Sequence, residues 1–158
     1  MNAGMDELYR EVILDHHRSP RGREPLPGPV DARAEGKNPS CGDELVLELA
    51  CAAGAITGAH VECRGCAIAT ASSSILAELV AGRTPQQARA LAEAFRTAMH
   101  SPDGVLADDL DPGDLEVLTG VRKFPARVKC ALLPWITLLS ALDAEGDGAP
   151  AAPATTEA

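Results

Sequence analysis

Apolar residues recur every three or four positions in several stretches of the chain, which is the spacing of a helix with one buried face. These stripes predict a helix over 6–17 and a second helix over 67–80, which Gly82 ends. The Thr84-Pro85 pair, an N-cap residue followed by proline, predicts the start of a third helix that extends to Met99.

The most apolar stripe runs over 125–142, where apolar residues from Val128 to Leu142 step alternately by four and three positions. It predicts a buried helix that tolerates Pro134. Its largely apolar part, 130–142, has 13 residues, whereas a helix that crosses a bilayer needs about 20. We therefore expect a core helix and no membrane partner.

Polar and apolar residues alternate over 44–51, and a second strand pattern over 55–63 follows the turn residues Ala52-Ala53-Gly54. These two segments predict a β-hairpin. Residues 31–37 fit a short edge strand. The stretch 19–30 before it holds four prolines and two glycines, which indicates a connector without regular structure.

A length of 158 residues predicts one compact domain, which we place at 1–142. The remaining stretch, 143–158, contains only small residues, proline, threonine and acids, and we expect it to be a disordered tail. The acidic stretch 101–113 is broken by two prolines and two glycines and predicts a loop, followed by a short helical turn over 114–118.

The charge and the aromatic content exclude nucleic acid as a ligand. A net charge of −9 repels phosphate, and aromatic residues that would stack on bases make up only 3% of the chain. The first ten residues carry acidic charge and no continuous apolar run. We therefore expect no secretory signal and a cytoplasmic protein.

Five cysteines, an odd number in a chain without an export signal, indicate thiol or metal chemistry rather than a disulfide framework. Cys41 and Asp43 lie in one loop before a strand, Cys66 directly precedes a helix, and Cys130 lies near the start of the last helix. Three cysteines at the ends of three elements fit convergence on one metal site. Their separations of 25 and 64 residues match no compact zinc finger.

Other interpretations of these residues remain open. Free cysteines are often small buried hydrophobes, which is our interpretation of Cys51. Cys63 forms a C-x-x-C with Cys66, the spacing of a zinc knuckle or redox pair, but it also continues the inward alternation of its strand. We expect surface or capping roles for the four histidines, His16, His17, His60 and His100.

Cations gather near the three cysteines in the sequence. They are six of the chain's 14 lysines and arginines: Lys37, Arg64, Arg122, Lys123, Arg127 and Lys129. Cations close to thiols lower thiol pKa values and attract an acidic partner, whereas the simpler interpretation is a solvated surface.

Several motifs, in this order, make the chain resemble a known family. The segments LYREVILDHH (8–17), NPSCGD (38–43), GCAIATASSS (65–74) and RVKCALLPW (127–135) are similar to the IscU/NifU N-terminal iron–sulfur assembly proteins. The resemblance covers about residues 5–142. The long segment between Cys66 and Cys130, and Lys129 where the scaffold branch has histidine, indicate the SufU branch of this family.

The resemblance implies an α+β fold, with a small antiparallel sheet packed against several helices and a metal site at one end. It implies that Cys41, Asp43, Cys66 and Cys130 bind zinc. It also implies a SufS-type cysteine desulfurase as a partner, with Cys41 accepting persulfide sulfur and Arg127 assisting at the interface. Downstream SUF scaffold proteins are further expected partners.

Three functions follow from these observations. The first is a zinc-dependent sulfurtransferase that activates a desulfurase rather than acting as a free-standing enzyme. The second is an IscU-like scaffold that assembles and transfers a [2Fe–2S] cluster, because thiolates bind iron as well as zinc. The third is a structural zinc domain. Lys129 and the long segment between Cys66 and Cys130 favour the first function over the second.

Overall fold

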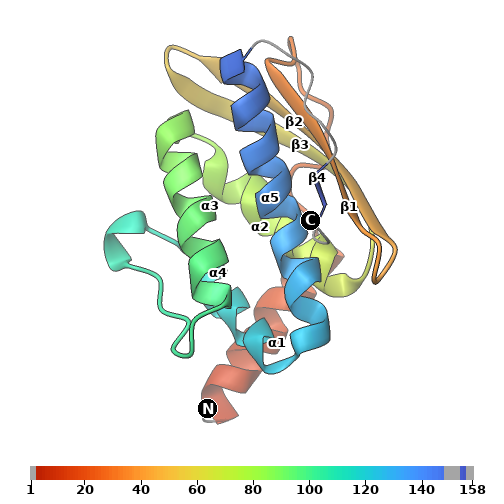
Figure 1. The fold of residues 1–158 in the computed structure, drawn as a ribbon, viewed down its shortest axis with the longest axis vertical. Coiled ribbons are helices and arrows are strands. Elements are labelled where there is room, and N and C mark those ends of the chain that lie inside the picture. The colour runs from red at the N-terminus through yellow and green to blue at the C-terminus, as the bar shows by residue number, and fades with distance from the viewer. Residues whose placement is uncertain (1–2, 148–153, 156–158) are drawn as a thin grey trace.

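The computed structural model describes residues 3–147 and 154–155, which fold into two layers (Figure 1). One layer is an antiparallel sheet of β1 (Ala32–Asn38), β2 (Asp43–Ala52) and β3 (Ala55–Arg64). The other layer consists of helices: α1 (Ala3–Arg18), α2 (Ala67–Val80), α3 (Pro85–Met99), α4 (Asp114–Leu118) and α5 (Pro125–Asp147). The predicted α+β class is confirmed.

The β2–β3 hairpin forms where the alternation predicted it. Its turn residues Ala53 and Gly54 have φ angles of 54° and 80°, the left-handed conformation that two-residue hairpin turns need. Strand β1 pairs antiparallel with β2, and Asn38 lies opposite Asp43 at the end of this pairing. The residues between them therefore form a tight loop at one end of the sheet.

Both edges of the three-stranded sheet are paired. The N–H of Val61 donates to the carbonyl of Gly22 at 2.8 Å, so the connector between α1 and β1 follows the edge of β3. A short strand β4 (Ala154–Thr155) pairs parallel with β1 at Gly36 and Lys37. The other residues of the predicted tail beyond α5 lie outside the described residues.

Two helix starts are fixed by caps. At α3, Thr84 and Gln87 form a capping box, in which each side chain accepts the other's backbone N–H at 3.1 and 3.0 Å. At α2, Cys66 is the N-cap residue, and its Sγ accepts the N–H of Ala69 at 3.5 Å. The start of α2 therefore fixes the position of Cys66.

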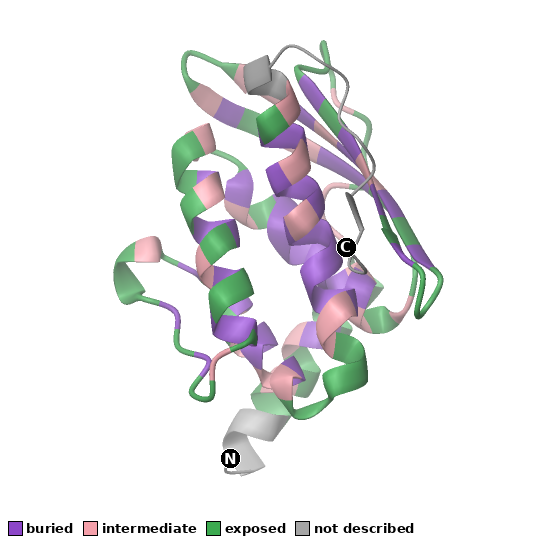
Figure 2. Cartoon of the chain, in the orientation of Figure 1, coloured by how far each residue is buried: buried purple, intermediate pink, exposed green. Residues whose placement is uncertain are grey.

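Helix α5 is the core helix that the sequence predicted, and Figure 2 shows its buried positions between the sheet and the other helices. By length and hydropathy Pro125–Ala144 is apolar enough to cross a membrane, but 61% of its most apolar window is buried inside the molecule, as in a core helix. It packs closely on β1 at Gly36, where a Cβ would collide with Thr137 and Leu133.

The C-terminal end of α5 differs from the prediction. The helix continues past the expected end at Leu142 to Asp147. The added turn is anchored because Asp143 pairs with Arg89 of α3 at 2.6 Å. Residues 143–147, expected in the disordered tail, are therefore helical.

Two arginines hold the acidic segment that projects beside α3 in Figure 1. Arg83 donates to the carbonyls of Leu110 and Asp111 at 2.9 and 2.7 Å, and Arg122 donates to the carbonyl of Pro102 at 2.8 Å. The predicted turn over 114–118 is confirmed as α4. Two short 3-10 helices that were not predicted flank it, η1 (Asp108–Leu110) and η2 (Thr119–Lys123).

Two histidines that we expected at the surface are buried, so that expectation is wrong. His16 is 0% exposed, and its ring nitrogens lie 2.7 Å from Ser74 Oγ and 2.8 Å from an Asp114 oxygen. His60 is 8% exposed, and its Nδ1 lies 3.0 Å from a Glu48 oxygen. The partners of His16 are 58 and 98 residues away in the chain, which is why the local pattern did not reveal its burial.

Candidate metal centre

Three of the four residues expected as ligands lie together at the end of the β1–β2 hairpin. Cys41, Asp43 and Cys130 each offer one ligand atom, and these atoms all lie within 4.8 Å of one another. The Sγ atoms of Cys41 and Cys130 are 3.5 Å apart although the residues are 89 positions apart in the chain. The hairpin and α5 therefore bring these side chains into one cluster.

Asp43 is 1% exposed and is held by two donors. Its Oδ1 accepts the backbone N–H of Cys66 at 3.0 Å, and its Oδ2 accepts the side-chain amide of Asn38 at 3.2 Å. Gly65 makes this approach possible, because a Cβ there would come within 2.6 Å of Asp43 Oδ1. The orientation of the carboxylate is therefore fixed on both oxygens.

The charge of this buried carboxylate indicates a cation. The two groups that donate to it, the Asn38 amide and the backbone N–H of Cys66, are both neutral. Burying a carboxylate without a positive partner is costly. A metal ion bound by Asp43 and the neighbouring thiols would supply that positive charge, so the donor set fits a thiolate-bound metal.

Cys130 is fully buried in the second turn of α5. Burial, and then hydrogen bonds with Asp43, Cys41 and Cys66, raises the pKa of its thiol. The metal-free thiol is therefore protonated at neutral pH, whereas a metal ligand is the thiolate. Metal binding at Cys130 must release a proton.

Cys66 lies beside this cluster rather than within the 4.8 Å group. Its backbone N–H holds Asp43, and its Sγ caps α2. The contact between the Cys66 and Cys130 thiols contributes to the raised pKa of Cys130. The structure thus places Cys66 next to the other three residues, with its thiol directed to the start of α2.

A serine fixes α2 relative to α5, and therefore Cys66 relative to Cys130. Ser72 on α2 is buried, and its hydroxyl donates to the carbonyl of Ala131 at 2.6 Å. The indole N–H of Trp135 donates to the same hydroxyl at 3.2 Å. These bonds join the two helices one residue beyond Cys130.

Cys41 is the exposed member of the cluster. Its backbone N–H and that of Gly42 both donate to the carbonyl of Asn38, at 3.2 and 2.8 Å. Gly42 has a φ of 75°, which glycine adopts without strain. The Cys41 thiol approaches the carbonyl of Ala126 at 3.9 Å. The loop therefore presents this thiol to solvent in front of Asp43 and Cys130.

Arg127 is a positively charged residue that interacts with the thiols of the cluster. A hydrogen bond to Cys130, and then the electrostatic interaction with Cys66, raises the pKa of its guanidinium. The Arg127 side chain is exposed. It therefore lies where a docking partner can reach it.

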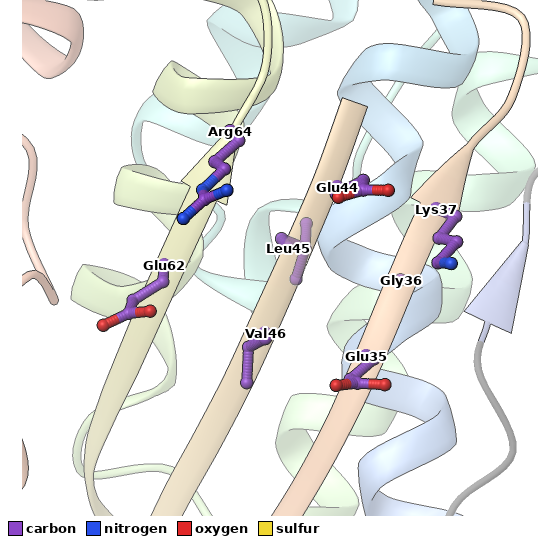
Figure 3. Close-up of a pocket in the computed structure, with 8 residues that line it drawn as sticks. All are labelled: Glu35, Gly36, Lys37, Glu44, Leu45, Val46, Glu62 and Arg64. Atoms are coloured by element: carbon purple, nitrogen blue, oxygen red, sulfur yellow. The ribbon is translucent and has the colours of Figure 1, made fainter. Parts of the chain in front are cut away.

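The expected cluster of six cations around the thiols is only partly formed. Lys37 and Arg64 lie on the opposite face of the sheet, where they flank Glu44 in a hollow of about 320 Å³ (Figure 3). Arg122 is occupied with the carbonyls of the acidic segment. Strand alternation turns Lys37 and Glu44 outward, because their neighbours Asn38 and Asp43 point inward, and Arg64 lies opposite Glu44 on the same face.

The two remaining cysteines are half-buried and pack against the hydrophobic core. Burial raises the pKa of the Cys63 thiol, as it does for Cys130. This environment is that of a small core residue for Cys63, as the inward alternation indicated. Cys51 packs in the same way.

The sequence patterns predict no individual role for Asn38 or Gly65 at this site. Asn38 is 0% exposed and contacts both Asp43 and Cys130 through its amide. A signal was available, because Asn38 follows Ala32, Ala34 and Gly36 on the inward side of β1. A polar residue at an inward position directly before a cysteine loop indicates a partner at the site.

This two-layer α+β domain gathers cysteines and a buried aspartate at one end of its sheet, a set of donors that fits a metal ion. The chain is a member of the NifU-like N-terminal domain family, whose model matches residues 8–131. It is 35% identical over 147 residues to the zinc-dependent sulfurtransferase SufU of Bacillus subtilis strain 168, covering 93% of this chain and 97% of that protein.

Two further proteins extend the comparison. The chain is 35% identical over 138 residues to the iron–sulfur cluster assembly scaffold protein IscU of Streptococcus pyogenes serotype M1, covering 87% of this chain and 84% of that protein. A crystal structure of a SUF-system scaffold protein from Fervidobacterium islandicum AW-1 superposes with a TM-score of 0.76 at 32% identity, covering 86% and 97% of the two chains. The family is that of iron–sulfur cluster assembly scaffolds of the SufU/IscU type.

Proposed function

We propose that this protein is a cytoplasmic, zinc-dependent sulfur acceptor in iron–sulfur cluster assembly. Cys41, Asp43, Cys66 and Cys130 hold the zinc, and Cys41 receives persulfide sulfur from a SufS-type cysteine desulfurase. One observation carries the proposal: a single exposed thiol lies on a loop in front of donors that are otherwise anchored. The likeness to the Bacillus subtilis zinc-dependent sulfurtransferase supports it.

Three thiolates and one carboxylate suit zinc, which when bound keeps its cysteine ligands deprotonated without redox chemistry. The proposed ligands differ in how firmly the structure holds their side chains. Asp43 is held by Asn38 and by the N–H of Cys66, Cys66 is held at the start of α2, and Cys130 is buried in α5. Cys41 is therefore the ligand that can move.

The sulfur transfer itself is a thiolate exchange. The Cys41 thiolate attacks the outer sulfur of the desulfurase persulfide and forms a new S–S bond. The persulfide's own S–S bond breaks, and the electron pair leaves with the inner sulfur as a cysteine thiolate of the desulfurase. Cys41 then carries the persulfide. Arg127 can pair with a partner carboxylate or stabilise the departing thiolate. Downstream SUF scaffold proteins are the proposed acceptors.

The test is the Cys41→Ala variant, with Cys51→Ala as a matched control outside the cluster. We expect Cys41→Ala to stay folded and to abolish stimulation of alanine release from cysteine by a SufS-type desulfurase, while Cys51→Ala stimulates like the wild type. In trapped wild-type protein, mass spectrometry should map the persulfide to Cys41. Full stimulation by Cys41→Ala, or a persulfide on Cys66 or Cys130, would contradict the proposal.

The second candidate is a scaffold that assembles a [2Fe–2S] cluster on the same cysteines, because the Streptococcus pyogenes IscU is as similar in identity as the sulfurtransferase. Elemental analysis and a visible spectrum of anaerobically purified protein separate the two. We expect one zinc per chain and no chromophore. Stoichiometric iron with a charge-transfer spectrum would support the scaffold function.

A further inference from the structure

Asn38 contacts three of the four residues of the candidate metal centre. Its carbonyl accepts the backbone N–H of Cys41, and its side-chain Nδ2 lies 3.2 Å from Asp43 Oδ2 and 3.6 Å from Cys130 Sγ. The side chain is 0% exposed. Asn38 is also the last residue of β1, so the sheet fixes its backbone.

We infer that Asn38 is the positioning residue of the metal centre, where one amide sets the orientation of Asp43 and Cys130 and the adjoining carbonyl folds the Cys41 loop. The inference rests on the proposed metal centre. It goes beyond that proposal because it assigns the arrangement of the ligands to a residue that is not itself a ligand.

The chemistry of the amide suits this role. The Asn38 NH₂ group carries two hydrogens, so it can donate to the carboxylate and to the sulfur together. Three thiolates and a carboxylate bring four negative charges around one divalent cation, and a buried donor offsets part of that excess. An aspartate at this position would accept only, and it would add a further negative charge.

The backbone carbonyl of Asn38 also helps to position the ligands, because it holds the Cys41 loop. Because Cys41 and Gly42 both donate to the Asn38 carbonyl, the loop turns back over the end of β1 and brings the Cys41 thiol to 3.5 Å from the Cys130 sulfur. Asn38 thus joins the exposed half of the centre to its buried half. The backbone bonds persist in any substitution, whereas the amide contacts do not, so mutagenesis can isolate the side chain.

The test compares Asn38→Ala and Asn38→Leu with the wild type and with Thr137→Val. Leucine has the same number and branching of side-chain heavy atoms as asparagine but none of its hydrogen-bond donors. Thr137 is a buried polar residue of α5 whose hydroxyl bonds within the helix, so it controls for the loss of a buried hydrogen bond. Zinc affinity is measured by chelator competition, and Co²⁺ absorption reports the thiolate ligands. Urea unfolding of the metal-free proteins reports stability alone.

We expect both Asn38 variants to lose about 10- to 100-fold in zinc affinity, the usual effect of removing a hydrogen-bond partner of metal ligands. Thr137→Val should bind zinc like the wild type even if its metal-free form is less stable. Leucine should not restore affinity, and the Co²⁺ spectrum of both Asn38 variants should change.

A purely structural role gives the opposite result. Zinc affinity within twofold of the wild type in either Asn38 variant, with loss confined to metal-free stability, would overturn the inference. So would recovery of affinity in Asn38→Leu. The measurement reads metal affinity rather than desulfurase stimulation. A wild-type protein that binds zinc but does not stimulate the desulfurase would refute the proposed function and leave this inference standing.

Discussion

Cys41 and Cys130 have sulfur atoms 3.5 Å apart but occupy opposite environments. Cys130 is buried in a helix, whereas Cys41 is exposed on a loop whose backbone N–H groups donate to the Asn38 carbonyl and whose thiol makes a long contact with Ala126. The two residues are both cysteines, but the fold leaves the Cys41 thiol accessible and encloses the Cys130 thiol. The residues around this pair can be tested one at a time.

Arg127→Ala should keep zinc, because Arg127 is not one of the proposed metal ligands. The variant should lower desulfurase stimulation several-fold, because it removes the positive charge that interacts with the thiols. The exposed Arg96 of α3 provides the control, and Arg96→Ala should stimulate like the wild type. Zinc content and alanine release are measured for both variants. Equal stimulation by the two would remove Arg127 from the proposed transfer.

Cys63→Ser and Cys51→Ser should both retain one zinc per chain. Each half-buried side chain packs against the core, so we expect a loss of about 1 kcal/mol in the free energy of unfolding. Zinc content and urea unfolding check the two variants together. Loss of zinc from Cys63→Ser alone would show that the C-x-x-C holds the metal.

The raised pKa of the Cys130 thiol predicts a pH dependence for the metal-free protein. An unfolded thiol loses its proton near its ordinary pKa of 9.0, whereas the buried thiol keeps its proton to higher pH. Folding stability is therefore intact below about pH 9 and falls as the pH rises further. In the zinc-loaded protein that proton is already gone, so this contribution should disappear.

Urea unfolding between pH 7 and pH 10, with and without a chelator, measures this effect. The Cys63 thiol also has a raised pKa and contributes a slope of the same sign in both forms. The test is therefore the difference in pH dependence of the free energy of unfolding between the zinc-loaded and the metal-free protein. An identical pH dependence with and without zinc would argue against Cys130 as a ligand.

At the scale of elements, local patterns predicted most of the fold. The bounds of α2 and α4 match the expected ranges, and the cap of α3 forms as the Thr84-Pro85 pair indicated. The differences arise from contacts that are distant in the chain. Asp143 extends α5 through Arg89, which is 54 residues away, and β4 depends on pairing with β1. A pattern read over a few residues contains no information about such partners.

The residues of the candidate centre were predicted from two sources rather than from hydrophobic periodicity. The positions of three cysteines at the ends of elements suggested that they converge, and the family resemblance selected Asp43 as the fourth residue. Neither source identified Asn38, because its role depends on Asp43 and Cys130 folding around it. Nor did either reveal that Lys37 and Arg64 lie on the other face of the sheet.

The junction between β3 and α2 can be tested at Gly65. A Cβ at this position would come within 2.6 Å of Asp43 Oδ1, so Gly65→Ala must displace the carboxylate. We expect at least about a tenfold loss of zinc affinity, by analogy with other disturbed ligand shells. Gly28→Ala is the control, because nothing lies within 4 Å of its added Cβ. Chelator competition on both variants provides the measurement, and normal affinity in Gly65→Ala would contradict the observed packing.

At the scale of the whole molecule, the centre joins the β1–β2 loop, the start of α2 and the second turn of α5. A ligand that binds only the folded state adds about 2.7 kcal/mol when it is present at 100 times its dissociation constant. For a domain of this size each kcal/mol corresponds to about 2–4 °C in Tm. Removing zinc should therefore lower the Tm by roughly 5–10 °C.

Thermal unfolding before and after chelation measures this stabilisation. Cys130→Ala provides the control, because a variant that lacks a buried ligand should show little further loss when the chelator is added. An unchanged Tm in the wild type after confirmed removal of zinc would show that the centre does not join the three elements.

The long separation between Cys41 and Cys130 also sets an order of events during synthesis. A ribosome adds about 5–20 residues per second, so the 89 positions between the two cysteines take about 4–18 s to make. During that interval the earlier thiols are present in the nascent chain without Cys130, the buried member of the cluster. The complete centre can receive its metal only after α5 has emerged. Reducing conditions around the ribosome would keep these thiols available until the rest of the centre is made.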